Sequence, residues 1–220
     1  MSCQAFGNLL QQHGNIITDV CCLELEVKNI RGCYFANVLD IICLNNQNNK
    51  NCSLLPNPAV YLFLVDIQTF TNFFSNYSSQ CSLSSYTNYF PLYVGSTTNF
   101  CLRYGSFVAS LLSGMRYPHV FGGELHEHLR SLPNFQPNFQ PIEMCLVVFY
   151  TNEVKKSNGK GYEKDKAKCI EHFILNHTNF CKTFNKNNSN CSLQGNQQRQ
   201  QLQNIANSII QTIQTLQSCP

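Results

Sequence analysis

The chain has 220 residues, of which 43% are hydrophobic and only 12% are charged, and its formal net charge is +3. This length and apolar content are enough for one folded domain with an appendage. A pI near 8.2 is compatible with a polyanionic partner but is too mild to argue for one. No apolar run approaches the roughly 18 residues that a membrane span needs, so no membrane partner is expected.

The 13 cysteines are interpreted as reduced thiols, most of them small buried apolar groups. The chain opens without the basic and apolar regions of a secretory signal. We therefore expect an intracellular protein, cytoplasmic if its host is a prokaryote.

Hydrophobic patterning predicts strands and helices in the first half of the chain. Residues 16–27 alternate toward their end as a strand does, whereas residues 34–44 have helical spacing. Residues 59–66 form a continuous apolar run, which is typical of a buried strand. The polar stretch from Thr69 to Asn88 has the composition of an insertion.

The second half reads as further alternation of strands and helices. A strand over residues 91–95 leads to N-capping residues at 96–99 and to a helix from Phe100 to about Leu112, ended by Gly114. A helix over 124–132 follows Gly122-Gly123. Residues 142–150 predict a third strand, and residues 163 to about 177 predict a helix.

The tail from Gln197 to Gln217 is predicted to be an amphipathic helix. Its apolar residues recur at three- and four-residue steps: Leu202, Ile205, Ile209, Ile213 and Leu216. Its polar face carries Gln and Asn rather than the basic residues that follow a phosphate backbone. We expect the helix to pack on the body of the chain or to pair with a second copy in a homodimer.

Two short segments carry a resemblance to a known family. Ala59-Val60-Tyr61 and Tyr93-Val94-Gly95 resemble the two motifs of the GIY-YIG nuclease superfamily. In that family an asparagine, an aromatic residue and, ten positions after the second tyrosine, an arginine follow; here these are Asn99, Phe100 and Arg103. Farther on, Glu171-His172-Phe173-Ile174 and Phe184-Asn185 match the glutamate-bearing helix and the asparagine of the family. The resemblance covers about residues 59–185.

The resemblance implies an α/β fold with a small, mostly antiparallel sheet flanked by helices. It also implies a Mg²⁺-dependent endonuclease that hydrolyses phosphodiester bonds in double-stranded DNA. Such a reaction needs an activated water, a cation at the phosphate and help for the leaving oxygen. The resemblance assigns these roles to Tyr61 or Tyr93 as general base, Arg103 at the phosphate and Glu171 as ligand of one Mg²⁺, with Asn185 in support.

About thirty residues separate the two motifs, as in GIY-YIG restriction endonucleases, so a site-specific enzyme of restriction type is expected. Residues 1–55 are then an N-terminal extension with candidate DNA-recognition elements. Residues 56–186 form the nuclease core with an insertion at 67–90, and residues 187–220 form a polar linker and the C-terminal helix. Four lysines are candidate contacts to the DNA backbone: Lys155, Lys156, Lys160 and Lys168.

Two departures from the family pattern affect the site. Ala59 replaces the glycine of the first motif, which is a small change. Phe107 stands where the family commonly has a histidine or tyrosine, four residues after the arginine. Either the missing group is supplied by Tyr104 or by a histidine, for which His119, His126 and His128 are the candidates, or the turn has a different register.

Other interpretations stay open. Taken singly, the two tyrosines fit core aromatics and Arg103 fits a solvated helix residue; the joint pattern favours the nuclease. The alternatives in function are a nuclease-derived DNA-binding protein that no longer cuts, a homing nuclease and a structure-selective repair nuclease. A zinc site is the rival chemistry, but its four candidates would spread around a helix: Cys169, His172, His177 and Cys181.

Overall fold

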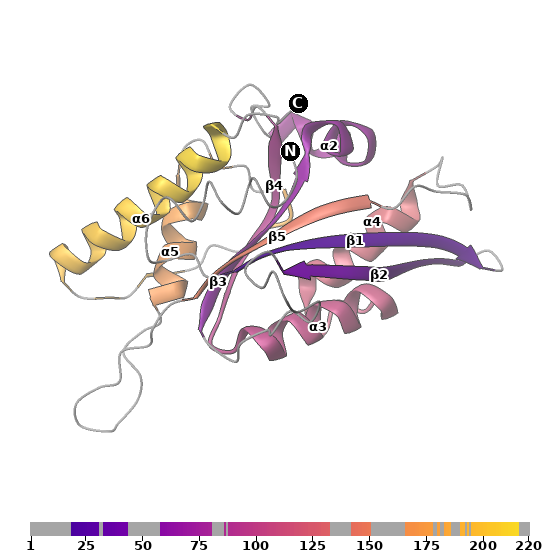
Figure 1. Ribbon diagram of the computed structural model, residues 1–220, viewed down its shortest axis with the longest axis horizontal. Coiled ribbons are helices and arrows are strands. Elements are labelled where there is room, and N and C mark those ends of the chain that lie inside the picture. Colours follow the sequence, from indigo (N-terminus) through magenta and orange to yellow (C-terminus); the bar gives the residue numbers. More distant parts are fainter. Residues whose placement is uncertain are drawn as a thin grey trace.

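The computed structural model describes residues 19–30, 33–43, 58–80, 86, 88–132, 142–150, 166–177, 180, 183–185, 190, 191, 193 and 195–215. Five strands form one antiparallel sheet in the order β2-β1-β5-β3-β4 (Figure 1). The strands are β1 (Asp19–Ile30), β2 (Cys33–Cys43), β3 (Ala59–Asp66), β4 (Tyr89–Thr97) and β5 (Ile142–Tyr150). The predicted α/β class, with an antiparallel sheet flanked by helices, is confirmed.

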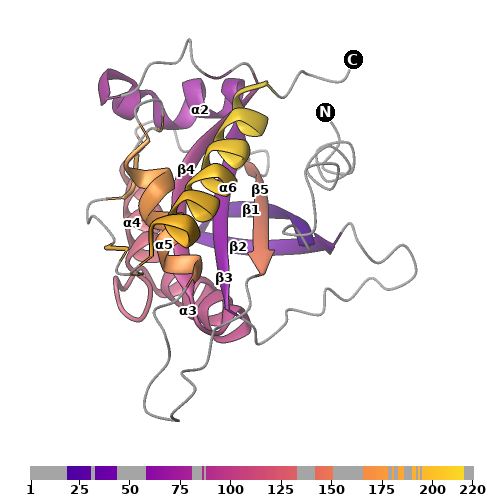
Figure 2. The ribbon, with the colours of Figure 1, turned by 90° about the vertical axis from the view of Figure 1, so that its left-hand side faces the viewer.

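The helices are α2 (Ile67–Phe74), the 3₁₀ helix η1 (Ser75–Gln80), α3 (Phe100–Ser113), α4 (Val120–Ser131), α5 (Lys166–Leu175) and α6 (Asn196–Thr215). Helix α5 packs on β3 and β4, whereas α3 and α4 pack on each other and contact β2. In Figures 1 and 2, α5 and α6 lie together on one side of the sheet.

Strand β3 is the centre of the core. Residues 59–65 are all buried, at 1% exposure or less, because β3 has strands on both edges and side chains against both faces. Burial on both faces explains why this strand is continuously apolar rather than alternating. On one face, the ring of Phe63 packs at 4.5 Å from that of Phe107 and at 5.1 Å from that of Phe121.

The helix predicted at residues 34–44 is wrong: this segment is strand β2. It pairs with β1 from Ile30↔Cys33 to Cys21↔Cys43, with one irregularity after Glu24. The segment is rich in aromatic and branched residues, which suit a strand, and an adjacent strand is available to satisfy its backbone. A short apolar run cannot be assigned by periodicity alone, and here pairing decided the outcome.

The predicted insertion contains ordered helix. Asp66 caps α2 through a 2.7 Å hydrogen bond from the Thr69 amide, and Phe70 and Phe74 are fully buried. The predicted α3 is confirmed: the Asn99 side chain caps its start, and Gly114 ends it with φ of 71°.

Helix α4 begins at Val120, four residues before the predicted start. Gly122 and Gly123 therefore lie inside the helix and not ahead of it. Their role is close contact: a Cβ at Gly122 would lie 2.6 Å from the Phe107 carbonyl oxygen, and one at Gly123 would lie 2.6 Å from that of Met115. The glycines allow α4 to approach α3 and the intervening loop.

The C-terminal helix α6 packs on α5 through its apolar face, which agrees with the expectation that it packs on the body (Figure 2). Its buried residues include Leu202, Ala206, Ile209, Ile210 and Ile213. The alternative of a homodimer through this helix stays a prediction. None of the helices in the described ranges combines the length and the apolar character that crossing a membrane requires.

One pair of cysteines contradicts the expectation of reduced thiols. Cys169 on α5 and Cys191, which precedes α6, form a disulfide across 22 residues. Cys169 is also buried in the core, as expected. The disulfide could not be predicted from the sequence, because it depends on how the segment before α6 folds back onto α5.

Candidate active site

The hydroxyl of Tyr61 is the point where the side chains of the site meet. Tyr61 lies on β3 and is 1% exposed. Its Oη accepts a hydrogen bond from Arg103 Nε at 3.0 Å and lies 3.1 Å from Nε2 of His119. Burial raises the pKa of Tyr61 well above its ordinary value, and the nearby Tyr93 adds to this, so Tyr61 stays a neutral phenol.

His119 is buried and neutral, and its protonation can be assigned. The Gly122 amide donates to Nδ1 at 3.4 Å, so Nδ1 is the acceptor and the proton of the neutral ring sits on Nε2. Nε2 therefore donates to Tyr61. Burial and the charge of Arg103 lower the pKa of His119 to about 3. The His119 amide is held by Ser110 Oγ at 2.9 Å.

Tyr93 on β4 lies beside Tyr61, with ring centroids 6.1 Å apart. Its ring stacks on Phe121 at 4.6 Å and is only partly buried. Burial raises the pKa of Tyr93, while the charge of Arg103 and hydrogen bonds from Tyr61 and Arg103 lower it. The oxygen of Tyr93 is thus an acceptor in the network, and Tyr93 is the more accessible of the two tyrosines.

Gly95 makes this pairing of tyrosines possible. A Cβ at this position would lie 2.6 Å from Tyr61 Oη and 2.8 Å from Cε1 of Tyr93. Gly95 is opposite Tyr61 in the register of β3 and β4. The last residue of the second motif is therefore a glycine because the Tyr61 hydroxyl crosses over its backbone.

Arg103 reaches the site from the first turns of α3. The cap at Asn99, which accepts from the Leu102 amide at 3.0 Å, fixes where this helix starts. Besides its bond to Tyr61, Arg103 donates through one terminal nitrogen to the carbonyl oxygen of Pro118 at 3.5 Å. Arg103 is half-buried, so its guanidinium lies where the tyrosine cluster, formed by Tyr61 and Tyr93, meets the surface.

Glu171 lies on α5, and its side chain reaches β4, the strand that also carries Tyr93. Its carboxylate accepts a hydrogen bond from the Ser96 hydroxyl. Side chains alternate along a strand, so Ser96 faces the side of β4 opposite to Tyr93. Glu171 is nevertheless close enough to Tyr93 that its negative charge raises the pKa of that tyrosine. The carboxylate and the tyrosine cluster thus flank β4, the edge strand of the sheet.

Asn185 covers the open edge of β4. Its side chain accepts from the Val94 amide at 3.0 Å and donates to the Val94 carbonyl at 2.6 Å. The neighbouring Phe184 amide donates to the Leu92 carbonyl at 3.1 Å. These bonds satisfy backbone groups that an edge strand would otherwise expose, and they fix β4 next to Tyr93.

The structure distinguishes between the candidates for the group missing at Phe107. Phe107 is buried, with its ring 5.5 Å from that of His119. His119 alone of the three histidines joins the tyrosine cluster, since His126 bonds the Leu111 carbonyl and His128 bonds the Phe73 carbonyl. The ring of Tyr104 packs against Phe100 and Phe107.

Of the four lysines predicted to contact the DNA backbone, Lys168 is exposed on α5. Lys155, Lys156 and Lys160 lie outside the described residues. In the part of the chain that the structure describes, no three His, Cys, Asp or Glu side chains gather closely enough to hold a metal ion between them. Glu171 offers one hard oxygen ligand, which suits Mg²⁺ completed by water molecules.

Two residues of the site were not assigned from the sequence. Ser96 was read only as part of a capping segment, and its contact with Glu171 needed the fold. His119 was one of three candidates, and its place as the cap of α4 became clear only from the structure, because the helix was predicted to start at Glu124. Comparison with known proteins gave no match to a family model, a curated protein or a solved structure.

Proposed function

We propose that this chain is a Mg²⁺-dependent endonuclease of GIY-YIG type that hydrolyses phosphodiester bonds in double-stranded DNA, with site specificity of the restriction type. The observation that carries the proposal is the convergence of Tyr61, Tyr93, Arg103 and Glu171 around one edge strand. These residues lie as far as 110 positions apart in the chain. Tyr61, Tyr93 and Arg103 lie together on one side of β4 and Glu171 lies on the other, and together they offer the donors, acceptors and charge that suit a phosphate.

Each residue has a task in this proposal. Arg103 is held by Tyr61 and Pro118 and presents its cation to the phosphate that is cut. Tyr93 orients the attacking water and, in its ionised form, takes the proton of that water and becomes a phenol, because it is the more accessible of the two tyrosines. Tyr61 and His119 position Arg103 and Tyr93. Glu171 would hold Mg²⁺, which supplies positive charge against the charge that builds on the phosphate.

The test is incubation of supercoiled plasmid DNA with the full chain and Mg²⁺. We expect discrete fragments from the wild type and at least a hundredfold slower cutting by Arg103→Ala and Glu171→Gln, since loss of one transition-state contact costs on the order of 10²–10³ in rate. Arg199→Ala is the matched control, because Arg199 is exposed on α6 outside the cluster. Each variant is checked for folding by circular dichroism.

The outcomes separate the proposal from its alternatives. Sequencing the fragment ends gives the cut site, and one recurring sequence supports restriction-type specificity. Cutting that is equal in Arg103→Ala and the wild type would overturn the assignment of the site. Tight DNA binding with no cutting by the wild type would favour the DNA-binding protein that no longer cuts.

A further inference from the structure

The exposed large apolar residues of the described structure gather in one segment. They are Leu102, Met115, Tyr117 and Val120, which are 70%, 66%, 86% and 54% exposed. Three of them are direct chain neighbours of the site: Leu102 precedes Arg103, Tyr117 precedes Pro118, and Val120 follows His119. Because Arg103 bonds the Pro118 carbonyl, the backbone directly after Tyr117 lies within reach of the Arg103 side chain. Clustered apolar exposure beside a reactive site marks a contact surface.

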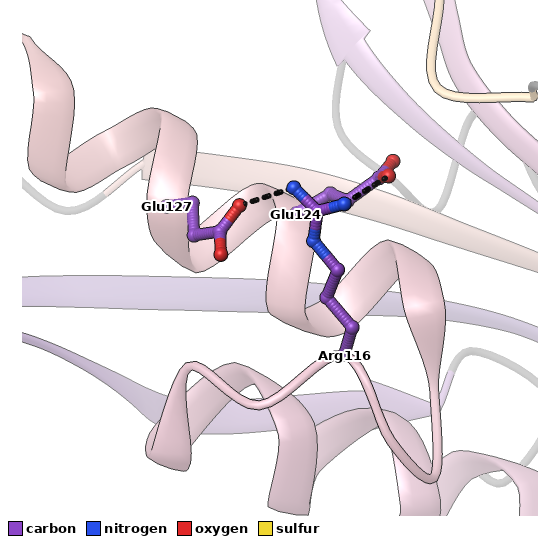
Figure 3. Close-up of polar contacts among 3 residues, drawn as sticks. All are labelled: Arg116, Glu124 and Glu127. Carbon is purple, nitrogen blue, oxygen red and sulfur yellow. Dashed lines mark hydrogen bonds and ion pairs between the residues drawn. The ribbon is translucent and has the colours of Figure 1, made fainter.

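The loop that carries Tyr117 is fastened on both sides of it. After Tyr117, the Pro118 carbonyl is held by Arg103 and the His119 amide by Ser110. Before it, Arg116 pairs with Glu127 at 2.7 Å and with Glu124 at 3.8 Å (Figure 3).

The same loop also packs tightly on α4. A Cβ at Gly123 would lie 2.7 Å from the Arg116 backbone, so no side chain separates the loop from the helix. Because the loop is already ordered, its aromatic ring can bind a partner without the entropic cost of ordering the loop.

The charge of the loop is already neutralised. Arg116 faces two carboxylates on α4, as Figure 3 shows, so its cation is committed within the protein. What the loop offers outward is the ring of Tyr117, which is 86% exposed. Such a surface suits a flat apolar partner rather than a phosphate. In DNA, the flat apolar group next to a phosphate is a nucleobase, which stacks on aromatic side chains whatever its sequence.

We propose that Tyr117 stacks against the base next to the phosphate held by Arg103 and opens that base step of the duplex. Wedges of this kind unstack a step and bend the duplex in other DNA-binding proteins. The inference rests on the proposed function for the position of the phosphate. It gives the chain a source of affinity that its low net charge of +3 does not supply.

The experiment uses a 30-base-pair duplex with 2-aminopurine next to the mapped cut, bound by the full chain with Ca²⁺ in place of Mg²⁺. If no cut is mapped, the 2-aminopurine stands at the centre of a mixed-sequence duplex. We expect the wild type to raise the fluorescence, since unstacking relieves quenching. Tyr117→Ala should abolish the rise and weaken binding roughly 5- to 150-fold, the range for loss of one stacked base. Tyr117→Trp should keep the rise and bind within about threefold of the wild type. Gln200→Ala, an exposed change on α6, is the control.

Failure of this inference is distinguishable from failure of the proposed function. Plasmid cutting by the wild type with equal fluorescence for Tyr117→Ala overturns the inference and leaves the nuclease proposal standing. A Tyr117-dependent rise without any cutting supports the stacking and rejects the nuclease. A DNA-free dimer that Tyr117→Ala dissociates, measured by sedimentation, would show that a second copy covers this surface and would overturn the inference.

Discussion

At the scale of single residues, the Tyr61 hydroxyl satisfies one buried donor and one half-buried donor at once. Arg103 Nε and His119 Nε2 both point to it. In Tyr61→Phe these donors lose their acceptor, so we expect the free energy of unfolding to fall by about 1–3 kcal/mol. Urea denaturation at pH 7.5 measures the change. Tyr117→Phe removes an exposed hydroxyl instead and should change stability by less than about 0.5 kcal/mol. Equal effects of the two changes would contradict the network.

Tyr93 is expected to behave differently from Tyr61. Its hydroxyl is more accessible, so Tyr93→Phe should abolish cutting while costing less stability than Tyr61→Phe. Burial raises the pKa of Tyr93, so at neutral pH the group is largely a phenol. The ionised fraction grows about tenfold per pH unit below the pKa. Single-turnover cleavage should therefore accelerate between pH 7 and 9, and a flat profile would argue against Tyr93 as the base.

His119 makes stability depend on pH. Its pKa is about 3 in the folded chain against 6.5 for the ordinary side chain, mainly through burial. Below pH 6.5, His119 binds a proton in the unfolded chain but stays neutral in the folded chain. The stability is therefore complete above pH 6.5 and falls by up to about 1.4 kcal/mol per pH unit as the pH drops toward 3. Urea melts at pH 7.5 and 5.5 measure the loss, and His119→Gln should reduce it.

Part of that loss remains in His119→Gln, because burial also lowers the pKa of His128. The prediction is therefore the difference between the wild type and His119→Gln at the two pH values. A wild-type stability that is the same at both would show that His119 accepts a proton in the folded chain.

At the scale of elements, the contact between α3 and α4 depends on glycine. In Gly122→Ala the new methyl would lie 2.6 Å from the Phe107 carbonyl oxygen, and backbone cannot move aside as a flexible side chain does. We expect a loss of about 1–3 kcal/mol from this overpacking. Gly105→Ala is the matched control on exposed α3, where nothing lies within 4 Å of the new methyl. There the better helix propensity of Ala should add roughly 1 kcal/mol. Melting temperatures that shift in opposite directions would bear out the assignment.

The same glycines show a limit of predicting secondary structure from sequence patterns. Gly122-Gly123 looked like a break before a helix, because glycine disfavours helices; contact with α3 and the loop outweighs that preference. Residues 34–44 looked helical, but pairing with β1 made them a strand. The elements with local signals were predicted well. Asn99 and Gly114 bound α3 through capping, and the apolar run at residues 59–66 became β3 with the predicted bounds.

The residues of the site also divide into those that were predicted from the sequence and those that were not. Tyr61, Tyr93, Arg103 and Glu171 were predicted together because their order and spacing resemble the GIY-YIG pattern. His119 and Ser96 could not, because they join the cluster through folding of the α3–α4 loop and packing of α5. A sequence pattern can identify residues that stand at a fixed spacing from one another. A residue that a loop brings to the site has no such spacing, so the pattern does not identify it.

At the scale of the whole molecule, the sheet order places the site and the N-terminal hairpin at opposite edges of the sheet. Strand β4, with the site, is one edge, and β2 is the other. The N-terminal hairpin β1–β2 therefore extends the sheet beyond β5, on the edge opposite to β4. Its proposed part in recognising DNA then requires a duplex that runs across the sheet from the site toward this hairpin, past α3 and α4, which contact β2.

The disulfide is a second feature of the whole molecule, because it ties α5 to the segment before α6. It closes a 22-residue separation, for which the loss of unfolded-chain entropy is worth about 3 kcal/mol. Cys191→Ser should lower the free energy of unfolding by about that amount when dithiothreitol is absent, and by much less when it is present. Cys101→Ser is the control, since Cys101 is exposed and free.

A second readout locates the effect of the disulfide. Without the bond, α6 is held by its packing on α5 and β4, so proteolysis should release the C-terminal segment of Cys191→Ser earlier than that of the wild type. Glu171 lies two residues from Cys169 on the same helix, but it is also held by Ser96 from β4. Cutting by Cys191→Ser should therefore persist below the melting temperature of the variant. Loss of cutting with the fold intact would mean that the disulfide, and not Ser96, keeps Glu171 in place.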